Sequence, residues 1–121
     1  MTFRHAILCA ALAFAPACHK TDTAEKSVEL MEDLGDAADK AGGDCAKLAD
    51  SVKSIAAKYQ GDLAEMKAFS DTVDHDKAAQ KQLEDKYADR LSKSTPKLMK
   101  MLKCSDDAGF KAAAAPLHGL Y

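Results

Sequence analysis

The sequence predicts an all-α protein, an antiparallel bundle of three to four helices closed by a disulfide bond between Cys45 and Cys104. Three observations support this fold class. The chain is rich in Ala, Lys, Asp, Glu and Leu, whereas the strand-forming residues Val, Ile and Thr are sparse. Its apolar residues recur every three or four positions, which is the helical period. Glycine, proline and aspartate punctuate these periodic segments where helices would begin and end.

The first helix of the domain is expected over residues 23–41. Asp22 followed by Glu25 resembles a capping box, which satisfies backbone N–H groups at a helix start. Gly42-Gly43 would end the helix, since glycine is the usual residue beyond a helix terminus. The apolar positions that would face the core are Ala24, Val28, Met31, Leu34, Ala38 and Ala41.

The second expected helix runs from Asp44, which would cap it, to about residue 70. Gly61 interrupts it at a cost of about 1 kcal/mol relative to alanine, so a local bend is compatible with the pattern. This segment has the most regular apolar spacing in the chain, with steps of three or four throughout: Cys45, Leu48, Val52, Ile55, Tyr59, Leu63, Met66 and Phe69.

A polar turn over residues 70–74 is expected to precede a third helix over residues 75–104. Pro96 lies inside this segment, where a proline costs about 3 kcal/mol and forces a kink or a break. Two helices meeting near residue 95 are the alternative. A short fourth helix is expected over residues 106–115, before Pro116. The apolar positions of the third helix are Ala79, Leu83, Tyr87, Leu91, Leu98 and Met101 or Leu102.

The first 17 residues have the three parts of a bacterial secretory signal peptide. Arg4 supplies a positive start, residues 6–15 are an uninterrupted apolar run, and Ala15-Pro16-Ala17 places small residues just before Cys18. The apolar run has about ten residues, whereas a membrane-spanning helix needs about 20. We therefore expect residues 1–17 to be removed on export, with Ala15-Pro16-Ala17 as a simple A-x-A cleavage site in one interpretation.

In a second interpretation, Ala15-Pro16-Ala17-Cys18 resembles the signal of bacterial lipoproteins, whose cysteine is acylated and becomes the first mature residue. The match is degenerate, because Ala15 stands where that signal prefers leucine and Pro16 is unusual at the next position. The resemblance implies lipidation of Cys18, a lipidated tether over residues 18–22 and a helical domain over residues 23–121. This domain resembles small exported helical-bundle proteins.

The lipoprotein resemblance also implies a partner and a cellular location. The partner would be a lipid bilayer, reached through acylated Cys18 on the periplasmic side of a bacterial cell envelope. His19 after the cysteine resembles lipoproteins that are sent to the outer membrane. A secreted or soluble periplasmic protein is the alternative location.

The four cysteines fit an exported protein with one internal disulfide. Cys9 would leave with the leader, and acylation would account for Cys18 as an odd thiol in an oxidising compartment. Cys45 and Cys104 then remain as a pair. In an antiparallel hairpin of the second and third helices they would lie level, because their midpoint falls beside the expected turn. Two separate buried thiols are the alternative. Closing a loop of about 60 residues is worth on the order of 4 kcal/mol.

The charge balance argues against nucleic-acid binding. The net charge is −2, and removal of Arg4 with the leader leaves 16 basic against 19 acidic residues. A nucleic-acid interface would require a clustered basic face.

Cofactor and metal motifs are weak, so neither is expected. Covalent haem attachment needs C-x-x-C-H, and Ala15 stands in place of its first cysteine. Met31 with His118 is faintly similar to the axial ligands of exported b-type cytochromes, although His118 lies beyond the last expected helix. His75, between two aspartates, resembles a helix start more than a metal site. Met99 and Met101 are expected to pack.

The sequence contains no nucleophile elbow and no glycine-rich phosphate loop, so we expect no enzymatic activity. The function expected first is an interaction or structural module with an envelope protein as partner. The alternative is a helical-bundle carrier of a small apolar ligand or of non-covalent haem.

Overall fold

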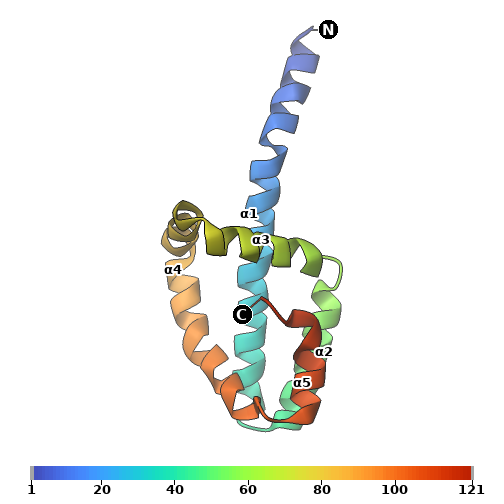
Figure 1. The fold of residues 1–121 in the computed structure, drawn as a ribbon, viewed down its shortest axis with the longest axis vertical. Coiled ribbons are helices and arrows are strands. Elements are labelled where there is room, and N and C mark those ends of the chain that lie inside the picture. Colours follow the sequence, from blue (N-terminus) through green and yellow to red (C-terminus); the bar gives the residue numbers. More distant parts are fainter. Residues whose placement is uncertain (1, 121) are drawn as a thin grey trace.

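The backbone of residues 2–120 and the side chains of residues 22–120 are described by a computed structural model. Over these residues the chain forms helices and no strand, which confirms the all-α class (Figure 1). In chain order the elements are α1 (Thr2–Ala41), α2 (Cys45–Tyr59), α3 (Leu63–His75), α4 (Lys77–Met99), the 3₁₀ helix η1 (Lys100–Cys104), α5 (Ala108–Ala114) and the 3₁₀ helix η2 (Ala115–Leu117).

The central element is α1, and it does not begin at residue 23. It is continuous from Thr2 to Ala41, so the predicted capping box is wrong. Glu25 instead forms an ion pair with Arg90 of α4. The predicted leader (residues 1–17), the lipidation site Cys18 and the tether after it fall almost wholly in residues 1–21, whose side chains lie outside the described residues. Those assignments stay predictions.

Aspartates begin three of the later helices. The carboxylate of Asp44 accepts a hydrogen bond from a backbone N–H in the first turn of α2, and Asp76 and Asp107 do the same for α4 and α5. Such caps satisfy donors that have no partner within the helix. The predicted cap at Asp44 is thus confirmed. Of the two aspartates beside His75, Asp76 is confirmed as a cap, whereas Asp74 lies in the last turn of α3 and caps no helix start. Gly42 and Gly43 end α1 with φ of 60° and 93°, a conformation that glycine adopts without strain.

The predicted second helix is broken into two. α2 ends at Tyr59, the backbone N–H of Asp62 donates to the Tyr59 carbonyl at 2.8 Å, and α3 begins at Leu63. Gly61 weakens the helix at this point. An ion pair of 2.7 Å between Lys26 and Asp62 fastens the corner to α1. As a result α3 turns away from the line of α2 and crosses α1 (Figure 1).

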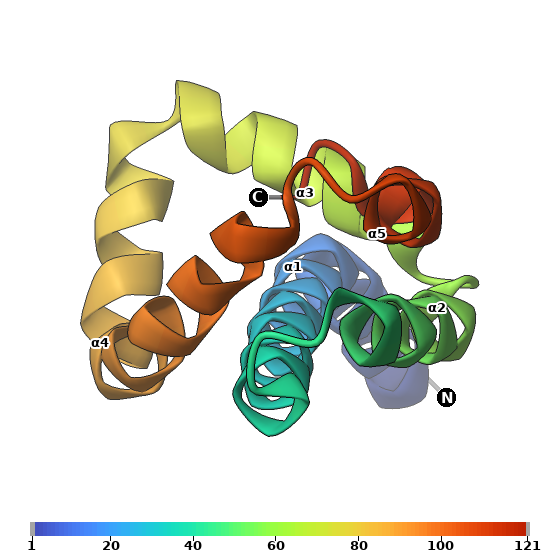
Figure 2. The same ribbon diagram turned by 90° about the horizontal axis from the view of Figure 1, so that it is seen from below.

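The path of the chain to the disulfide differs from the predicted hairpin. The expected turn over residues 70–74 is helical, and the chain changes direction at Asp76 instead. α4 then lies on the other side of α1 from α2 (Figure 2). The Cys45–Cys104 disulfide is nonetheless present, with the two Cα atoms 5.4 Å apart, because η1 carries Cys104 beneath α1 to the start of α2.

Pro96 neither splits α4 nor starts a new helix. α4 continues through it and ends three residues later at Met99, where the chain tightens into η1. The hydroxyl groups of Ser94 and Thr95 donate to the carbonyls of Arg90 and Leu91, one turn back. Because the proline lies close to the helix end, the backbone hydrogen bond that it removes costs less than one in the middle.

α1 and α4 run in the same direction, joined by a row of ion pairs. Arg90 contacts Glu32 at 2.8 Å, Lys97 contacts Asp36 at 2.7 Å, and Lys100 is paired with Asp39. The partners are separated by 58, 61 and 61 residues. Between parallel helices, the residue numbers of contacting partners differ by a nearly constant amount. Between antiparallel helices, the sum of the two numbers is constant instead. The ion pairs therefore fix the register of the two helices.

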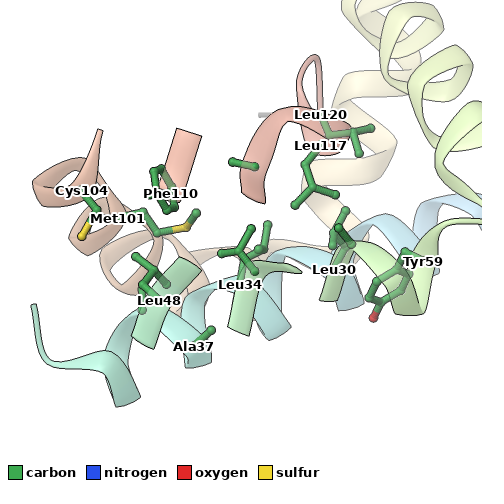
Figure 3. Packing of buried hydrophobic residues seen from close by; sticks show 14 of the residues in the cluster. Leu30, Leu34, Ala37, Leu48, Tyr59, Met101, Cys104, Phe110, Leu117 and Leu120 are labelled. Carbon is green, nitrogen blue, oxygen red and sulfur yellow. The ribbon is translucent and has the colours of Figure 1, made fainter. Parts of the chain in front are cut away.

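The main core lies between α1, α2, α5 and the C-terminal segment. Figure 3 shows Leu117 and Leu120 of that segment facing Leu30 and Leu34 of α1. Leu117 is fully buried and Leu120 is 9% exposed. The other members of this cluster are Ala37, Ala38, Leu48, Val52, Ala56, Tyr59, Leu63, Met66, Met101, Cys104, Phe110 and Ala114. A second, smaller cluster of Ala24, Val28 and Tyr87 joins α1 to α4.

The disulfide is expected to contribute substantially to stability, because it fastens the end of η1 to the start of α2. Replacing Cys45 and Cys104 together by alanine should lower the free energy of unfolding by on the order of 4 kcal/mol, as the closed loop has about 60 residues. Urea denaturation of the oxidised proteins measures this. Reductant should shift the wild-type midpoint and leave the double variant unchanged; an equal shift in both would contradict the assignment.

The Arg90 ion pairs should make stability fall in acid. Hydrogen bonds from Arg90 are the main cause that lowers the pKa of Glu25 and Glu32 below their ordinary value of 4.5. Their contribution is therefore complete above the unfolded-state pKa and is lost as pH falls through the lower folded-state pKa. Arg90→Gln should lower the urea midpoint at pH 7, and its difference from wild type should shrink below about pH 4.5. A difference that stayed constant down to pH 3 would contradict this, and Lys93→Gln, exposed on the same helix, is the charge-matched control.

Candidate functional site

An apolar pocket of about 330 Å³ lies between α1, α3, α4 and the C-terminal segment. Figure 2 shows how these helices are arranged: α3 and α4 meet at an angle, α1 lies beside both, and the C-terminus lies between them. Its lining is almost entirely hydrophobic and consists of Ala24, Ser27, Val28, Leu30, Met31, Leu34, Met66, Phe69, Ser70, Val73, Asp74, Leu83, Leu91, Leu98, Gly119 and Leu120.

The wall formed by α4 exists because α4 contacts α1 through a different face from its leucines. Tyr87, Ser94 and Met101, seven residues apart, are buried. Leu83, Leu91 and Leu98 follow the same seven- or eight-residue spacing on an adjacent face, and they remain half-buried where they line the pocket. The sequence predicts every member of both sets except Ser94 as core. The structure buries the first set. In the second set, Leu83 and Leu91 pack against the edge of the Ala24, Val28 and Tyr87 cluster, Leu98 packs against the main core, and all three also line the pocket.

The close contact that holds α4 against α1 is centred on Gly35. A Cβ atom at this position would lie 3.1 Å from Cβ of Lys97 and 3.4 Å from the carbonyl oxygen of Ser94. Glycine therefore allows the two backbones to approach more closely than any residue with a side chain would. This contact sets the position of the α4 wall relative to α1.

α3 forms the wall opposite this contact. Met66 is fully buried, whereas Phe69 and Val73 are half-buried and line the pocket. Because α3 crosses α1 rather than running beside it, its residues approach α1 closely only around the crossing point. Leu30 and Leu34 of α1 and Leu120 of the C-terminal segment complete the pocket.

The few polar groups of the pocket belong to Ser27, Ser70 and Asp74. The Ser27 hydroxyl donates to the carbonyl of Thr23 at 2.8 Å and keeps its acceptor capacity. Within the described part of the chain, the Ser70 hydroxyl forms no hydrogen bond, and the carboxylate of Asp74 is exposed and forms no ion pair. The lining contains no basic side chain.

The Arg90 cluster beside the pocket has the properties of a structural ion pair. Arg90 binds Glu32 through two nitrogens, each 2.8 Å from a carboxylate oxygen, and also contacts Glu25. The Tyr87 hydroxyl is buried near Glu25, whose pKa it lowers slightly, but no group meets it with hydrogen-bond geometry in the described residues. Both glutamates have a lowered pKa, whereas a general acid needs a raised one.

A second polar cluster joins α1 to α2. Lys58 and the hydroxyl of Tyr59 each lie 2.8 Å from the same carboxylate oxygen of Asp33. Burial, followed by the hydrogen bond to Asp33, raises the pKa of Tyr59 to about 12. The phenol therefore stays protonated and donates to Asp33, which suits a structural link.

The structure does not bring the predicted metal and haem candidates together. Met31 lines the pocket, but His118 is exposed and lies outside the lining. His75 contacts the Asp71 carbonyl through Nδ1 at 2.7 Å, and this hydrogen bond raises its pKa. Met99 is exposed, whereas Met101 is buried. Over the described residues, no three His, Cys, Asp or Glu side chains gather in a way that would hold a metal ion.

A more open groove of about 590 Å³ runs between α2 and α5. Its polar lining residues are Asp50, Lys53 and Gln60. The other lining residues are mostly small: Ala49, Ala56, Ala57, Leu63, Gly109, Ala112, Ala113 and Pro116. Its lining is also mostly apolar, but the groove is more open to solvent than the pocket and would enclose a ligand less completely.

No helix in the described part of the chain combines the length and the apolar character needed to cross a membrane. Comparison of the chain with protein-family models, with curated proteins and with solved structures finds no match.

The pocket could not be predicted from the sequence, although one feature of the sequence is consistent with it. The last helix is short and rich in alanine, so it adds little apolar volume to cover the other helices. It lies against α2 and not against α4 (Figure 1). The leucines on the pocket face of α4 are therefore not covered by the last helix and stay half-buried.

Gly35 should be intolerant of substitution. Gly35→Ala would gain about 1 kcal/mol of helix propensity, but the added methyl would press on Lys97 and Ser94, so we expect a net loss of stability. Thermal unfolding measures the effect. Gly61→Ala, in the turn between α2 and α3, is the control for adding a methyl without a close contact, since nothing lies within 4 Å of a Cβ there. A Gly35→Ala variant more stable than wild type would contradict the close contact.

Proposed function

We propose that this chain is a non-enzymatic, exported binding protein that holds one small apolar molecule in the pocket between α1, α3 and α4. The observation that carries the proposal is the pocket itself. Ligand sites in proteins have volumes of about 300–1,000 Å³ and mostly apolar walls with a few polar groups. A pocket of about 330 Å³ with three polar residues in its lining fits that description.

The pocket volume limits the size of the ligand. A cavity of roughly 150 Å³ lined by aliphatic side chains binds benzene, so about 330 Å³ accommodates on the order of a dozen carbon atoms. The residues of α1 that line it extend from Ala24 to Leu34, which is about 15 Å along the helix axis. An elongated aliphatic molecule suits this shape better than haem, for which the pocket offers Met31 without a histidine.

Export and membrane attachment belong to the same proposal. The apolar leader and the Ala15-Pro16-Ala17-Cys18 motif support cleavage after residue 17 and acylation of Cys18. Acylation would hold the pocket close to a bilayer on the periplasmic side of the envelope, where apolar molecules partition. The antiparallel bundle predicted from the sequence enters the proposal in modified form, as an antiparallel pair of α1 and α2 with α4 parallel to α1.

An envelope interaction module is the second candidate, and one observation favours it. Met99 and Leu102 are 61% and 65% exposed at the end of the domain remote from the predicted tether. Adjacent exposed apolar side chains often mark an interface. Site-specific cross-linking from position 102 in intact envelopes would test this candidate, since a defined partner adduct should form there and not from the solvent-exposed position 93.

The pocket proposal predicts that a bulky side chain will block binding. Leu91→Trp places an indole in the pocket, whereas Leu102→Trp makes the same substitution at an exposed position outside it. Titrated calorimetrically, the apolar probe decanol, whose size and shape suit the pocket, should bind wild type and Leu102→Trp at one site each, and Leu91→Trp at least tenfold more weakly.

Circular dichroism should show that both variants remain folded. Absence of probe binding to the wild type, or equal binding by both variants, would contradict a carrier function.

A further inference from the structure

We propose that the pocket selects amphiphiles with a single aliphatic chain and a cationic, hydrogen-bond-donating head group, such as a primary ammonium, over fatty-acid anions. This inference rests on the proposed binding function and specifies its ligand class. It is carried by the distribution of charge and of hydrogen-bonding groups over the pocket lining.

The polar residues and the apolar end of the pocket lie in different places. Ser70 and Asp74 belong to the C-terminal half of α3, next to the start of α4. Leu34 and Leu98 lie more than two helical turns along α1 and α4 from Ala24 and Leu83, the first residues of those helices in the lining. An aliphatic chain would therefore lie among the leucines, with its head group at the end of α3.

The charge at that end is negative. Asp74 is the one ionisable residue in the lining, and its carboxylate forms no ion pair within the described residues. His75 follows it in sequence and feels its charge, but the ring contacts the carbonyl of Asp71, one turn back on α3, and forms no ion pair with Asp74. A carboxylate head group would meet Asp74 without a compensating basic side chain from the lining, whereas an ammonium would meet an opposite charge.

The hydroxyl groups favour the same choice. Ser27 already donates its proton to the Thr23 carbonyl, so it offers a ligand its oxygen as an acceptor. Ser70 is half-buried and has no partner in the described part of the chain. An ammonium donates three hydrogen bonds and accepts none, which suits a lining whose polar side chains offer mainly acceptor oxygens. A carboxylate accepts only, and the lining side chains would offer it a single free donor, Ser70.

Asp74 is exposed, so its effect on affinity should be moderate. Exposed ion pairs contribute at most about 1 kcal/mol, which corresponds to about a fivefold change in Kd. Asp74 raises the affinity for a cation and lowers the affinity for an anion, so both effects increase the ratio of the two affinities. The preference for a cationic over an anionic amphiphile of equal chain length should therefore reach about tenfold, and it should decline with ionic strength.

The test compares three probes with the same chain: decylammonium, decanol and decanoate, each titrated calorimetrically into the oxidised protein at pH 7 and low salt, below the concentration at which the probe aggregates. Wild type should bind decylammonium most tightly and decanoate most weakly. Asp74→Asn should reduce the ratio of their affinities about fivefold or more and change decanol binding less than twofold. Asp71→Asn removes the same charge from α3 outside the lining and should leave the ratio within twofold of wild type.

Each outcome separates the two proposals. Equal affinity for all three probes, or a preference for decanoate, overturns the head-group inference and leaves the pocket function standing. A preference that falls equally in Asp74→Asn and Asp71→Asn also overturns it, because the effect would then come from the general charge of α3. If none of the probes binds the wild type, the carrier function itself fails.

Discussion

The attachment of α4 to α1 is the constraint on which the rest of the structure depends. It uses Gly35 for close approach and charged side chains for register, and it leaves the leucine face of α4 directed elsewhere. In most small helical domains the apolar face of a helix is the one that packs. Here Arg90, Ser94 and Lys97 contact α1, whereas the leucines of the adjacent face line the pocket and pack only against the edges of the two apolar clusters. The residues that fix α4 against α1 are thus largely distinct from those that line the pocket.

The break between α2 and α3 has an equally direct effect on the pocket. A continuous helix through residues 60–62 would carry Met66 and Phe69 away from α1 along the line of α2. The turn at Gly61, fastened by Lys26 and Asp62, instead lays α3 across the top of the space beside α1. Crossed helices touch over a short length, so they enclose volume that parallel helices would fill with side chains.

Local features of this fold were predictable from the sequence, and long-range features were not. Helical periodicity, the caps at Asp44 and Asp76 and the Cys45–Cys104 bond follow from residue types and spacing, and the structure confirms them. The predicted hairpin of the second and third helices was wrong. Equal distances of Cys45 and Cys104 from a turn imply direct packing of two helices, whereas in the structure α1 lies between α2 and α4. Arg90 and Lys97 carry no local sign of their partners about 60 residues away. The pocket is a property of that tertiary arrangement, so its leucines were indistinguishable from core.

The long separation between α1 and its partners also determines when the domain acquires its structure. The residues that fix α4 against α1 follow their partners by 58–65 positions, and the two disulfide cysteines are 59 positions apart. Such non-local contacts form late and slowly compared with contacts within a helix. The side of α1 that packs on α2 and α3 can be covered as soon as those helices are made, whereas the side that packs on α4 waits for nearly the entire chain. The parallel α1–α4 pair and the disulfide are therefore the last parts of the domain that a growing chain can form.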